Sequence, residues 1–205
     1  MNKSQLTNFI TKYTLGGEIK STKWTSDGNS LSTRFISGDK SVVGKVELNK
    51  FSHLKPCELG VYNTGQLTSL LSVLGDDVEV NLSQSGDKFI SMELEDTKRK
   101  TKSKYMLSDL SVIPTPPELK NLPDSFELGI KVDPYFVNTF ISGKGALAEA
   151  ETFTILTENG ETKIVIGYAS IASNRVTIPV ETTKQADIEP ISFNANMFAS
   201  ILNAN

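Results

Sequence analysis

The stretch Asn-Thr-Gly-Gln-Leu-Thr-Ser-Leu-Leu at residues 63–71 decides the fold, because it repeats the pattern Asn-Lys-Ser-Gln-Leu-Thr-Asn-Phe-Ile at residues 2–10. In each stretch an Asn stands where a helix would begin, and a Gln follows three residues later. This spacing predicts a reciprocal cap that satisfies the backbone N–H groups left free at a helix start. Apolar residues then recur at helical spacing, which predicts two short helices with one apolar face each.

A second pair of helices is predicted further along the chain. Asp133 and Asn194 stand at the corresponding cap positions, and apolar residues again follow at helical spacing. The interval from Asn2 to Asn63 is 61 residues, and so is the interval from Asp133 to Asn194. A duplicated unit that contains two short helices at a fixed spacing explains this equality, so repetition governs the architecture.

Strand-like segments separated by turns fill the rest of the chain. Clusters of Gly, Asp and Asn interrupt runs with the composition of strands, as hairpins require. The strands expected in the first copy are 18–24, 30–37, 41–48, 58–62, 78–82, 88–94 and 101–107. Those expected in the second copy are 151–157, 162–169, 175–181 and 191–193. We therefore expect an α+β fold, in which duplicated units of two short helices pack on antiparallel sheets.

Three prolines, Pro114, Pro116 and Pro117, lie between the two copies, where they exclude a regular helix or a central strand. We expect a first domain at 1–109, a proline-rich connector at 110–123 and a second domain at 124–205. Residues 75–109 follow the second helix in the first copy, whereas essentially nothing follows it in the second. The second domain is therefore expected to lack its final strands, either through natural abbreviation or through C-terminal truncation, which we favour.

Composition narrows the class of protein. The net charge is −3, divided as +2 over residues 1–109 and −5 over residues 110–205, so charge leaves nucleic-acid binding open. The chain has no run of 18 apolar residues and no apolar segment near Met1 that resembles a signal peptide. Its one cysteine, Cys57, allows no internal disulfide. We expect a cytoplasmic protein that does not contact membranes.

Motifs for catalysis or metal binding are scarce. His53 is the only histidine, and with Cys57 it supplies two ligands where a structural zinc ion needs four. The Gly-Lys-Gly at 143–145 lacks the upstream glycine and the following Ser or Thr of a phosphate-binding loop. We expect no catalytic residues, no metal and no cofactor, and a protein that is not an enzyme.

Lysines recur at every second position from Lys98 to Lys104, which places all four on one face if the segment is a strand. Such a stripe could attract phosphates. It could equally prevent the edge strand of a sheet from pairing with strands of other molecules, or mark an edge that pairs with a strand of another subunit. The two interpretations as a sheet edge are favoured over direct phosphate contact.

All four predicted helices lack acidic residues. No Asp or Glu occurs in residues 1–17, 62–75, 134–148 or 195–205. An ordinary solvated helix face would explain the polar residues, but such faces normally contain Glu, which is a good helix former. Helices without carboxylates are suited to facing a polyanion.

The repeat, the proline connector and the acid-free helices together resemble those of a DNA polymerase sliding clamp, and the T-even bacteriophage type is the most similar one. Residues 59–80 resemble the strand–helix–turn–strand segment of that family's first domain, and Gln-Ser-Gly-Asp at 84–87 resembles its next hairpin. The resemblance implies a DNA-clamp fold that assembles, at full length, into a ring-shaped homotrimer. Such a ring encircles double-stranded DNA without reading its sequence and tethers a DNA polymerase after an ATP-dependent clamp loader has placed it.

The resemblance also implies three sets of functional residues. Those expected to face DNA are Lys3, Lys12, Lys20 and Lys144, and changing Lys3, Lys12 and Lys144 to Glu is expected to weaken retention on DNA with folding intact. Those expected at the subunit interface are Lys102, Lys104, Tyr105 and Leu107 on one side and Val176 and Ile178 on the other. Those expected to line an apolar groove for partner peptides are Val112, Ile113 and Leu119.

Two other classes of function remain open at this point. A structural or interaction protein of the virion type, built from duplicated α+β modules, would show the same repeat. A hydrolase with an unrecognised site is the third possibility. The absence of Glu from the helices favours the clamp, because a virion module has no reason to avoid Glu there.

Overall fold

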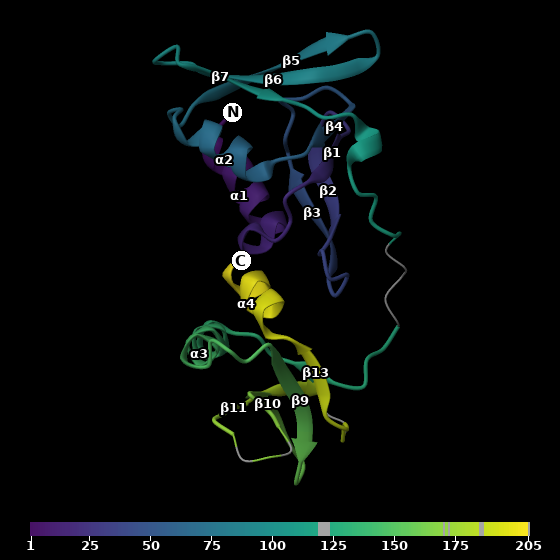
Figure 1. The fold of residues 1–205 in the computed structure, drawn as a ribbon, viewed down its shortest axis with the longest axis vertical. Helices are drawn as coiled ribbons and strands as arrows, with labels where there is room; N and C mark the ends of the chain where they lie inside the picture. Colours follow the sequence, from purple (N-terminus) through teal and green to yellow (C-terminus); the bar gives the residue numbers. More distant parts are fainter. Residues whose placement is uncertain (119–123, 170, 172, 185–186, 205) are drawn as a thin grey trace. The chain divides into compact units, whose positions relative to one another are not determined.

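The computed structural model describes residues 1–118, 124–169, 171, 173–184 and 187–204. The chain divides into two compact units, Met1–Leu119 and Lys120–Asn205 (Figure 1). The described part of the predicted connector, residues 110–118, thus belongs to the first unit. No helix in the described ranges is long and apolar enough to cross a membrane.

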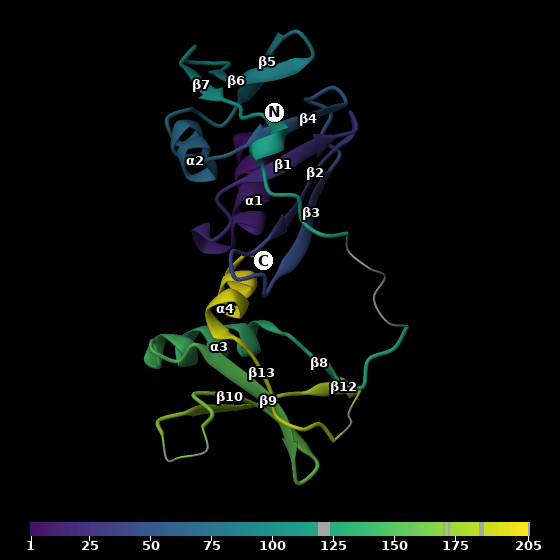
Figure 2. The same ribbon diagram turned by 45° about the vertical axis from the view of Figure 1, so that its right-hand side comes forward.

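The first unit contains two antiparallel sheets and two α-helices. One sheet has the strand order β3-β2-β1-β4, and the other has the order β5-β6-β7. In chain order its elements are α1 (Lys3–Thr14), η1 (Leu15–Gly17), β1 (Thr22–Ser26), β2 (Ser30–Ile36), β3 (Val43–Asn49), β4 (Cys57–Val61), α2 (Thr64–Ser72), β5 (Val78–Ser85), β6 (Lys88–Asp96), β7 (Lys102–Met106) and the 3-10 helix η2 (Leu110–Val112). Figure 2 shows α1 on one side of the four-stranded sheet and the segment that follows η2 on the other.

The second unit repeats the first sheet and its two helices. Its main sheet has the order β11-β10-β9-β13, so β9 pairs with β10 and β13 as β1 pairs with β2 and β4. Its elements are β8 (Gly129–Ile130), α3 (Pro134–Ala146), β9 (Thr152–Glu158), β10 (Glu161–Ile166), β11 (Val176–Pro179), β12 (Thr182–Lys184), β13 (Ile191–Asn194) and α4 (Ala195–Asn203). The α+β class and the duplicated helix-and-sheet arrangement are therefore confirmed.

Most predicted strands appear within a few residues of their expected positions. The segment predicted as one strand at 175–181 differs, because β11 ends at Pro179 and the chain enters β12, which pairs with β8 instead. The Val180 N–H still donates to the Thr162 carbonyl oxygen of β10 at 3.3 Å, so the chain leaves the sheet after this bond and not at Pro179.

All four predicted helix caps form. The Oδ1 atoms of Asn2, Asn63, Asp133 and Asn194 each accept a backbone N–H from the first turn of the helix that follows, at 2.8 to 3.0 Å. The reciprocal half predicted from the Gln residues is wrong at Asn63. Its backbone N–H donates to the Tyr105 hydroxyl at 2.9 Å, so a side chain from β7 takes the place expected for Gln66.

Aromatic residues fill the core of each unit. In the first unit Trp24 on β1 is fully buried and packs edge-on against Phe9 of α1, with ring centroids 5.5 Å apart. Trp24 Nε1 donates to the Tyr13 hydroxyl at 3.2 Å, and that hydroxyl also lies 3.2 Å from Thr64 Oγ1 at the start of α2. Desolvation in this core raises the pKa of Tyr13.

Phenylalanines replace this arrangement in the second unit. Phe140 of α3 is fully buried and lies 5.1 Å from Phe153 of β9 and 4.9 Å from Phe198 of α4, measured between ring centroids. Edge-to-face pairs of this kind add to the stability gained by burial alone. The two copies therefore keep one topology with different core side chains.

Candidate functional site

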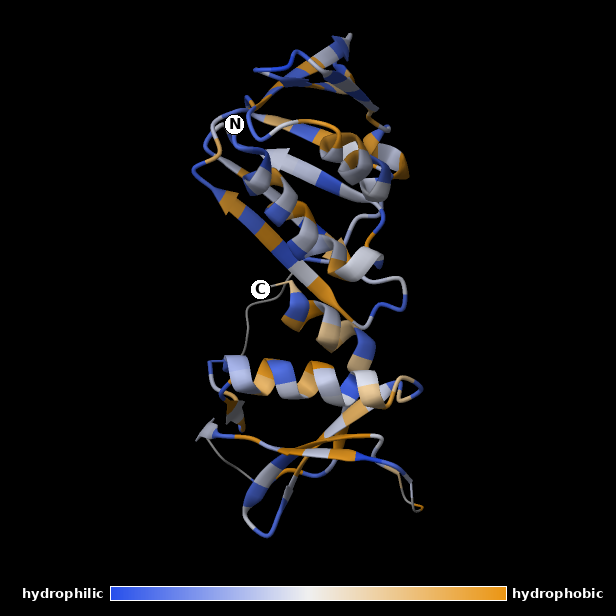
Figure 3. Ribbon diagram, turned by 90° about the vertical axis from the view of Figure 1, so that its left-hand side faces the viewer, coloured by the Kyte–Doolittle hydropathy of each residue, from blue (hydrophilic) through white to orange (hydrophobic). Residues whose placement is uncertain are grey.

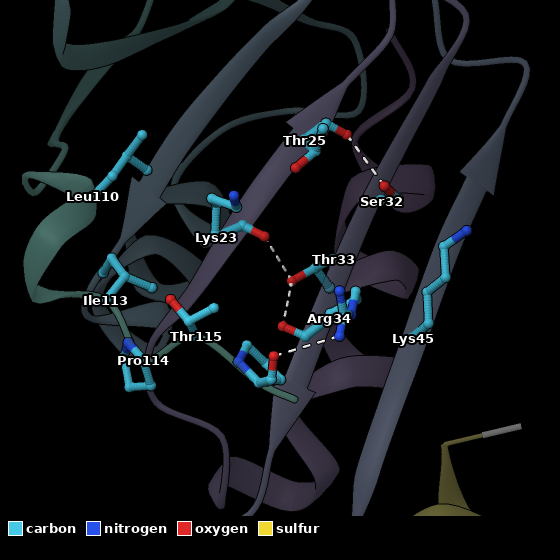
Figure 4. A pocket seen from close by; sticks show the side chains of 11 residues that line it. Lys23, Thr25, Ser32, Thr33, Arg34, Lys45, Leu110, Ile113, Pro114 and Thr115 are labelled. Atoms are coloured by element: carbon cyan, nitrogen blue, oxygen red, sulfur yellow. Dashed lines mark hydrogen bonds between the residues drawn. The ribbon is translucent and has the colours of Figure 1, made fainter. Parts of the chain in front are cut away.

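A groove of about 350 Å³ lies between the first sheet and the segment that follows β7 (Figure 4). The sheet contributes the face opposite Trp24, because alternate residues of a strand point to opposite faces. Cross-strand pairs Lys23–Arg34 and Thr25–Ser32 stand side by side on that face. Leu110, Ile113, Pro114, Thr115 and Pro116 supply the other wall. The groove therefore combines an apolar wall with a polar and cationic floor.

Arg34 joins the two walls. Its Nη2 atom donates to the carbonyl oxygen of Pro116 at 3.4 Å and also to that of Pro117. Its Nε atom is buried and has no hydrogen-bond partner among the described residues. The guanidinium thus holds the connector with one nitrogen while a second donor is left unsatisfied, which is rare for a buried polar atom.

Gly60 of β4 anchors the start of the connector. The backbone N–H of Ser108 donates to the carbonyl oxygen of Gly60 at 2.9 Å. A Cβ atom at position 60 would lie 2.2 Å from the Ser108 carbonyl oxygen and 3.4 Å from Ile113, so only glycine allows this close approach. This contact positions Ile113 at the groove.

The three residues predicted to line the partner groove have different outcomes. Ile113 lines it and is 5% exposed. Val112 does not line it, because η2 turns its side chain outward, where it is 58% exposed. Leu119 lies outside the described residues. Sequence reasoning missed Arg34, Lys23 and Lys45, which line the groove; only their alternation along strands could have indicated a shared face.

Two of the lysines predicted to face DNA are engaged within the protein. Lys144 is 9% exposed, and its Nζ donates to the carbonyl oxygens of Leu147 and Ala148, the latter at 2.7 Å. The assignment of Lys144 to a DNA-facing surface is therefore wrong. Lys3 is half-buried, and its Nζ donates to the Leu74 carbonyl oxygen just beyond α2. Both ammonium groups donate to carbonyl oxygens that lie at or just beyond the C-terminal end of a helix, where a cation is favoured.

Lys12 and Lys20 are the other two predicted DNA-facing lysines. Lys12 is half-buried on α1 and Lys20 is exposed; neither forms an ion pair within the described ranges. The exposed residues of the helices are mostly uncharged and polar, including Ser4, Asn8, Gln66, Ser69, Asn138 and Asn196. Figure 3 shows hydrophilic and hydrophobic colours alternating along α3, as expected of a helix with one buried face. No carboxylate lies within any of the four helices.

The stripe of four lysines is interrupted. Only Lys102 and Lys104 lie on β7, whereas Lys98 and Lys100 lie in the turn that joins β6 to β7. The single-face prediction is therefore wrong for that half of the run, because the tight turn ends the strand geometry. All four lysines pair with carboxylates at 2.8 to 3.6 Å, in the pairs Lys98–Asp77, Lys100–Glu95, Lys102–Glu95 and Lys104–Glu93. Internal neutralisation disfavours a phosphate-binding stripe.

β7 and β11 are both edge strands of their sheets. On β7, the Tyr105 side chain points inward to Asn63, and Leu107 is half-buried, with its N–H bonded to the Ile90 carbonyl oxygen. Sequence reasoning missed Met106, which is 61% exposed on the same strand.

The two interface residues predicted on β11 do not present free side chains. Ile178 is 2% exposed in the core of the second unit, and half-buried Val176 lies against Gly143 of α3. The side chains of Tyr105 and Ile178 therefore point into their own units, and their predicted place at a subunit interface depends on pairing of the strand backbones. On both strands, the side chains that point outward belong to the residues that alternate with Tyr105 and Ile178.

Sequence reasoning also missed an apolar pocket of about 310 Å³ in the second unit. Phe126, Ile191 and Phe193 line it and are each about half exposed. Phe193 stacks on Phe153, with ring centroids 5.5 Å apart, so the pocket opens directly above the core.

The residues considered for catalysis or metal binding do not gather. Within the described ranges no group of three or more His, Cys, Asp and Glu side chains could hold a metal ion. His53 packs against Phe51, and desolvation lowers the pKa of its imidazole. Burial raises the pKa of the Cys57 thiol, which disfavours the nucleophilic thiolate.

Comparison with known proteins identifies the fold. No known protein family and no curated protein match the sequence. A solved structure described as the C-terminal region of FEN-1 bound to A. fulgidus PCNA matches 100% of this chain and 81% of its own chain, with a TM-score of 0.70 and 12% sequence identity. The protein therefore has the fold of a PCNA-type sliding clamp. At this identity the likeness establishes the fold alone.

Proposed function

We propose that the protein is a sliding clamp that encircles duplex DNA and tethers a replicative DNA polymerase. One observation carries the proposal: the four-stranded sheets of the two units have the same strand order, and each unit has a pair of helices without a single carboxylate. Polar uncharged side chains and scattered lysines attract a phosphate backbone without reading bases, which suits a protein that must slide. Such a protein acts by tethering, and we propose that it is not an enzyme.

Ring formation is the second part of the proposal. Three copies join edge to edge, β7 of one subunit pairing with β11 of the next. Backbone geometry supports this role for β7. Leu107 N–H bonds to Ile90 O and Asp96 N–H to Thr101 O, so by antiparallel alternation Lys102, Lys104 and Met106 direct their backbone N–H groups away from β6.

The groove beneath the connector is proposed to receive a peptide of the polymerase or of an ATP-dependent clamp loader. Its apolar wall and its place beside the connector support this assignment. The resemblance of residues 59–80 to the T-even bacteriophage type supports a phage clamp that acts in the cytoplasm of a bacterial host.

Retention on DNA of different topology tests the proposal. The protein, loaded with clamp loader and ATP, should remain on nicked circular DNA and slide off when the circle is cut, because only a ring is topologically linked. Polymerase run length should rise only under loading conditions. Equal stimulation on linear DNA without a loader, or sequence-specific DNA binding, would rule out topological tethering.

Charge reversal tests the DNA-facing lysines. The double variant with Lys12→Glu and Lys20→Glu should leave circular DNA sooner at low salt, because two phosphate contacts are lost. Lys55→Glu serves as the control, since Lys55 is exposed in a loop away from the helices. Equal residence times for the double variant and the wild type would remove both lysines from the DNA-facing surface.

A further inference from the structure

Three cations stand in one row across the floor of the groove. Lys23 of β1 is directly opposite Arg34 of β2, and Arg34 is directly opposite Lys45 of β3. Like charges in directly opposed positions destabilise a sheet unless anions compensate them. The row therefore requires negative charge on this face.

The two outer cations have carboxylate partners and the central one has none. Lys23 pairs with Glu58 at 2.7 Å, and Lys45 pairs with Glu47 at 2.7 Å. Arg34 forms no ion pair with any described residue, and the described lining of the groove contains no carboxylate. Its guanidinium contacts the neutral carbonyls of Pro116 and Pro117 instead.

The unsatisfied donor of Arg34 lies at a specific edge of the guanidinium. Nε–H and one N–H of Nη2 are parallel and match the two oxygens of a carboxylate. Nη2 is occupied by the prolyl carbonyls, and Nε has no partner among the described residues. A carboxylate could satisfy both nitrogens at once, whereas the connector satisfies only one.

We propose that Arg34 is the carboxylate receptor of the groove. A partner peptide places apolar side chains against Leu110, Ile113 and Pro114 and a carboxylate on the Nε–Nη2 edge of Arg34, where it displaces the carbonyls of the connector. This inference rests on the proposed function, in which the groove takes a partner peptide. The carboxylate belongs either to an Asp or Glu side chain or to the C-terminus of the peptide.

Binding of a carboxylate to Arg34 also changes the contacts of the connector. Because Nη2 is bonded to the carbonyls of the connector and Nε is buried, we expect the connector to move away from Arg34 when a carboxylate binds to that edge. The Pro116 and Pro117 carbonyls then lose their donor and become free to bond to the peptide or to water. A peptide without a carboxylate cannot replace the prolyl carbonyls on Arg34 with a charged acceptor. Arg34 therefore favours acidic partners over neutral ones.

Four versions of one short fluorescent peptide test the proposal. Each contains the same Leu and Phe residues, with Asp or Asn in the middle and a carboxylate or an amide at the C-terminus. Fluorescence anisotropy at constant ionic strength measures affinity, and the Nε–H signal of Arg34 in an NMR spectrum reports contact. We expect at least one carboxylate to strengthen binding by about tenfold to a hundredfold over the doubly neutral peptide, as for charge-assisted hydrogen bonds. Comparison of the two singly acidic peptides identifies the source of the carboxylate.

Variants locate the effect at Arg34. Arg34→Gln should bind all four peptides with similar affinity, and Arg34→Lys, which keeps the charge but loses the paired donors, should retain only part of the preference. Arg99→Gln makes the same charge change in the turn between β6 and β7 and should behave like the wild type. Circular dichroism checks that each variant is folded.

Each contrary result has its own meaning. Equal affinity of the wild type for acidic and neutral peptides, or full preference in Arg34→Gln, overturns the role of Arg34 and leaves the groove intact. Binding of none of the four peptides overturns both the groove and this inference. Once the protein has been loaded, its residence time on circular DNA depends on ring closure and not on the groove, so residence time separately decides the proposed clamp function.

Discussion

At the scale of single residues, lysines of this chain have different tasks according to the groups around them. The ammonium groups of Lys3 and Lys144 donate to carbonyls just beyond the C-terminal ends of α2 and α3, where the helix dipole favours a cation. The expectation that Glu at these two positions leaves folding intact is therefore withdrawn, because a carboxylate there would face carbonyl oxygens. Lys12 and Lys20, which make no such contacts among the described residues, keep their assignment as candidates for phosphate contact.

Replacement of Lys144 by Met tests the structural role of this lysine. The Met side chain keeps most of the apolar stem but removes both hydrogen bonds to the Leu147 and Ala148 carbonyls. We expect a loss of about 0.5–1.5 kcal/mol in the free energy of unfolding, the usual net contribution of a hydrogen bond, because the Leu147 carbonyl keeps the Ala150 N–H as a donor and Ala148 is exposed to water. Urea denaturation of the whole chain measures it. Lys12→Met is the matched control and should change stability by less than about 0.5 kcal/mol; equal effects of the two changes would contradict the capping role.

At the scale of elements, the start of α2 is stabilised both by its own N-cap residue and by a side chain far away in the sequence. The cap of α2 takes its side-chain acceptor from Asn63 within the segment, but the donor of Asn63 itself bonds to Tyr105 on β7. Tyr105 thereby ties the last strand of the second sheet to the start of a helix. The same residue was predicted to face another subunit, and its inward direction follows from strand alternation around the buried Ser103.

Two alanine substitutions separate the two halves of this cap. Asn63→Ala removes the acceptor for the Gln66 N–H and should lower the free energy of unfolding by about 0.5–2 kcal/mol, the range for helix N-caps. Gln66→Ala should have almost no effect, since the Asn63 N–H already has Tyr105 as its acceptor. Thermal denaturation followed by circular dichroism distinguishes the outcomes. A large loss of stability in Gln66→Ala would instead support the reciprocal cap that the sequence predicted.

At the scale of the whole molecule, duplication explains the architecture. The sheets β3-β2-β1-β4 and β11-β10-β9-β13 have the same topology. In each unit one helix precedes the first of these strands along the chain, and another follows the last. The sheet formed by β5, β6 and β7 has no counterpart in the described second unit. Among the edge strands are β7 in the first unit and β11 in the second, either of which a second chain could extend.

A single proline tests whether β7 joins subunits. Lys104→Pro removes an N–H that points away from β6, so the fold should survive while pairing with another chain is lost. Lys104→Gln removes only the charge and should assemble like the wild type. Analytical ultracentrifugation should show trimers of the 22.4 kDa chain for the wild type and Lys104→Gln, and monomers for Lys104→Pro. A trimer of the proline variant would exclude β7 as the joining strand.

The sequence alone determined the elements and their repetition. Helix starts are encoded locally, because Asn2, Asn63, Asp133 and Asn194 bond to backbone groups within three residues of themselves. Apolar periodicity likewise reports which face of a helix is buried, because it depends only on the geometry of that helix. These signals were sufficient for the α+β class, the duplication and the resemblance to clamps.

Only the tertiary structure decided which side chains meet across the chain. The row formed by Lys23, Arg34 and Lys45 depends on strand register, and a shift of one residue would turn each of them to the opposite face. The bonds from Arg34 to the connector join residues more than 80 positions apart. Long side chains such as those of Lys144 and Arg34 reach whatever groups folding places near them, so their partners cannot be inferred from neighbours in sequence.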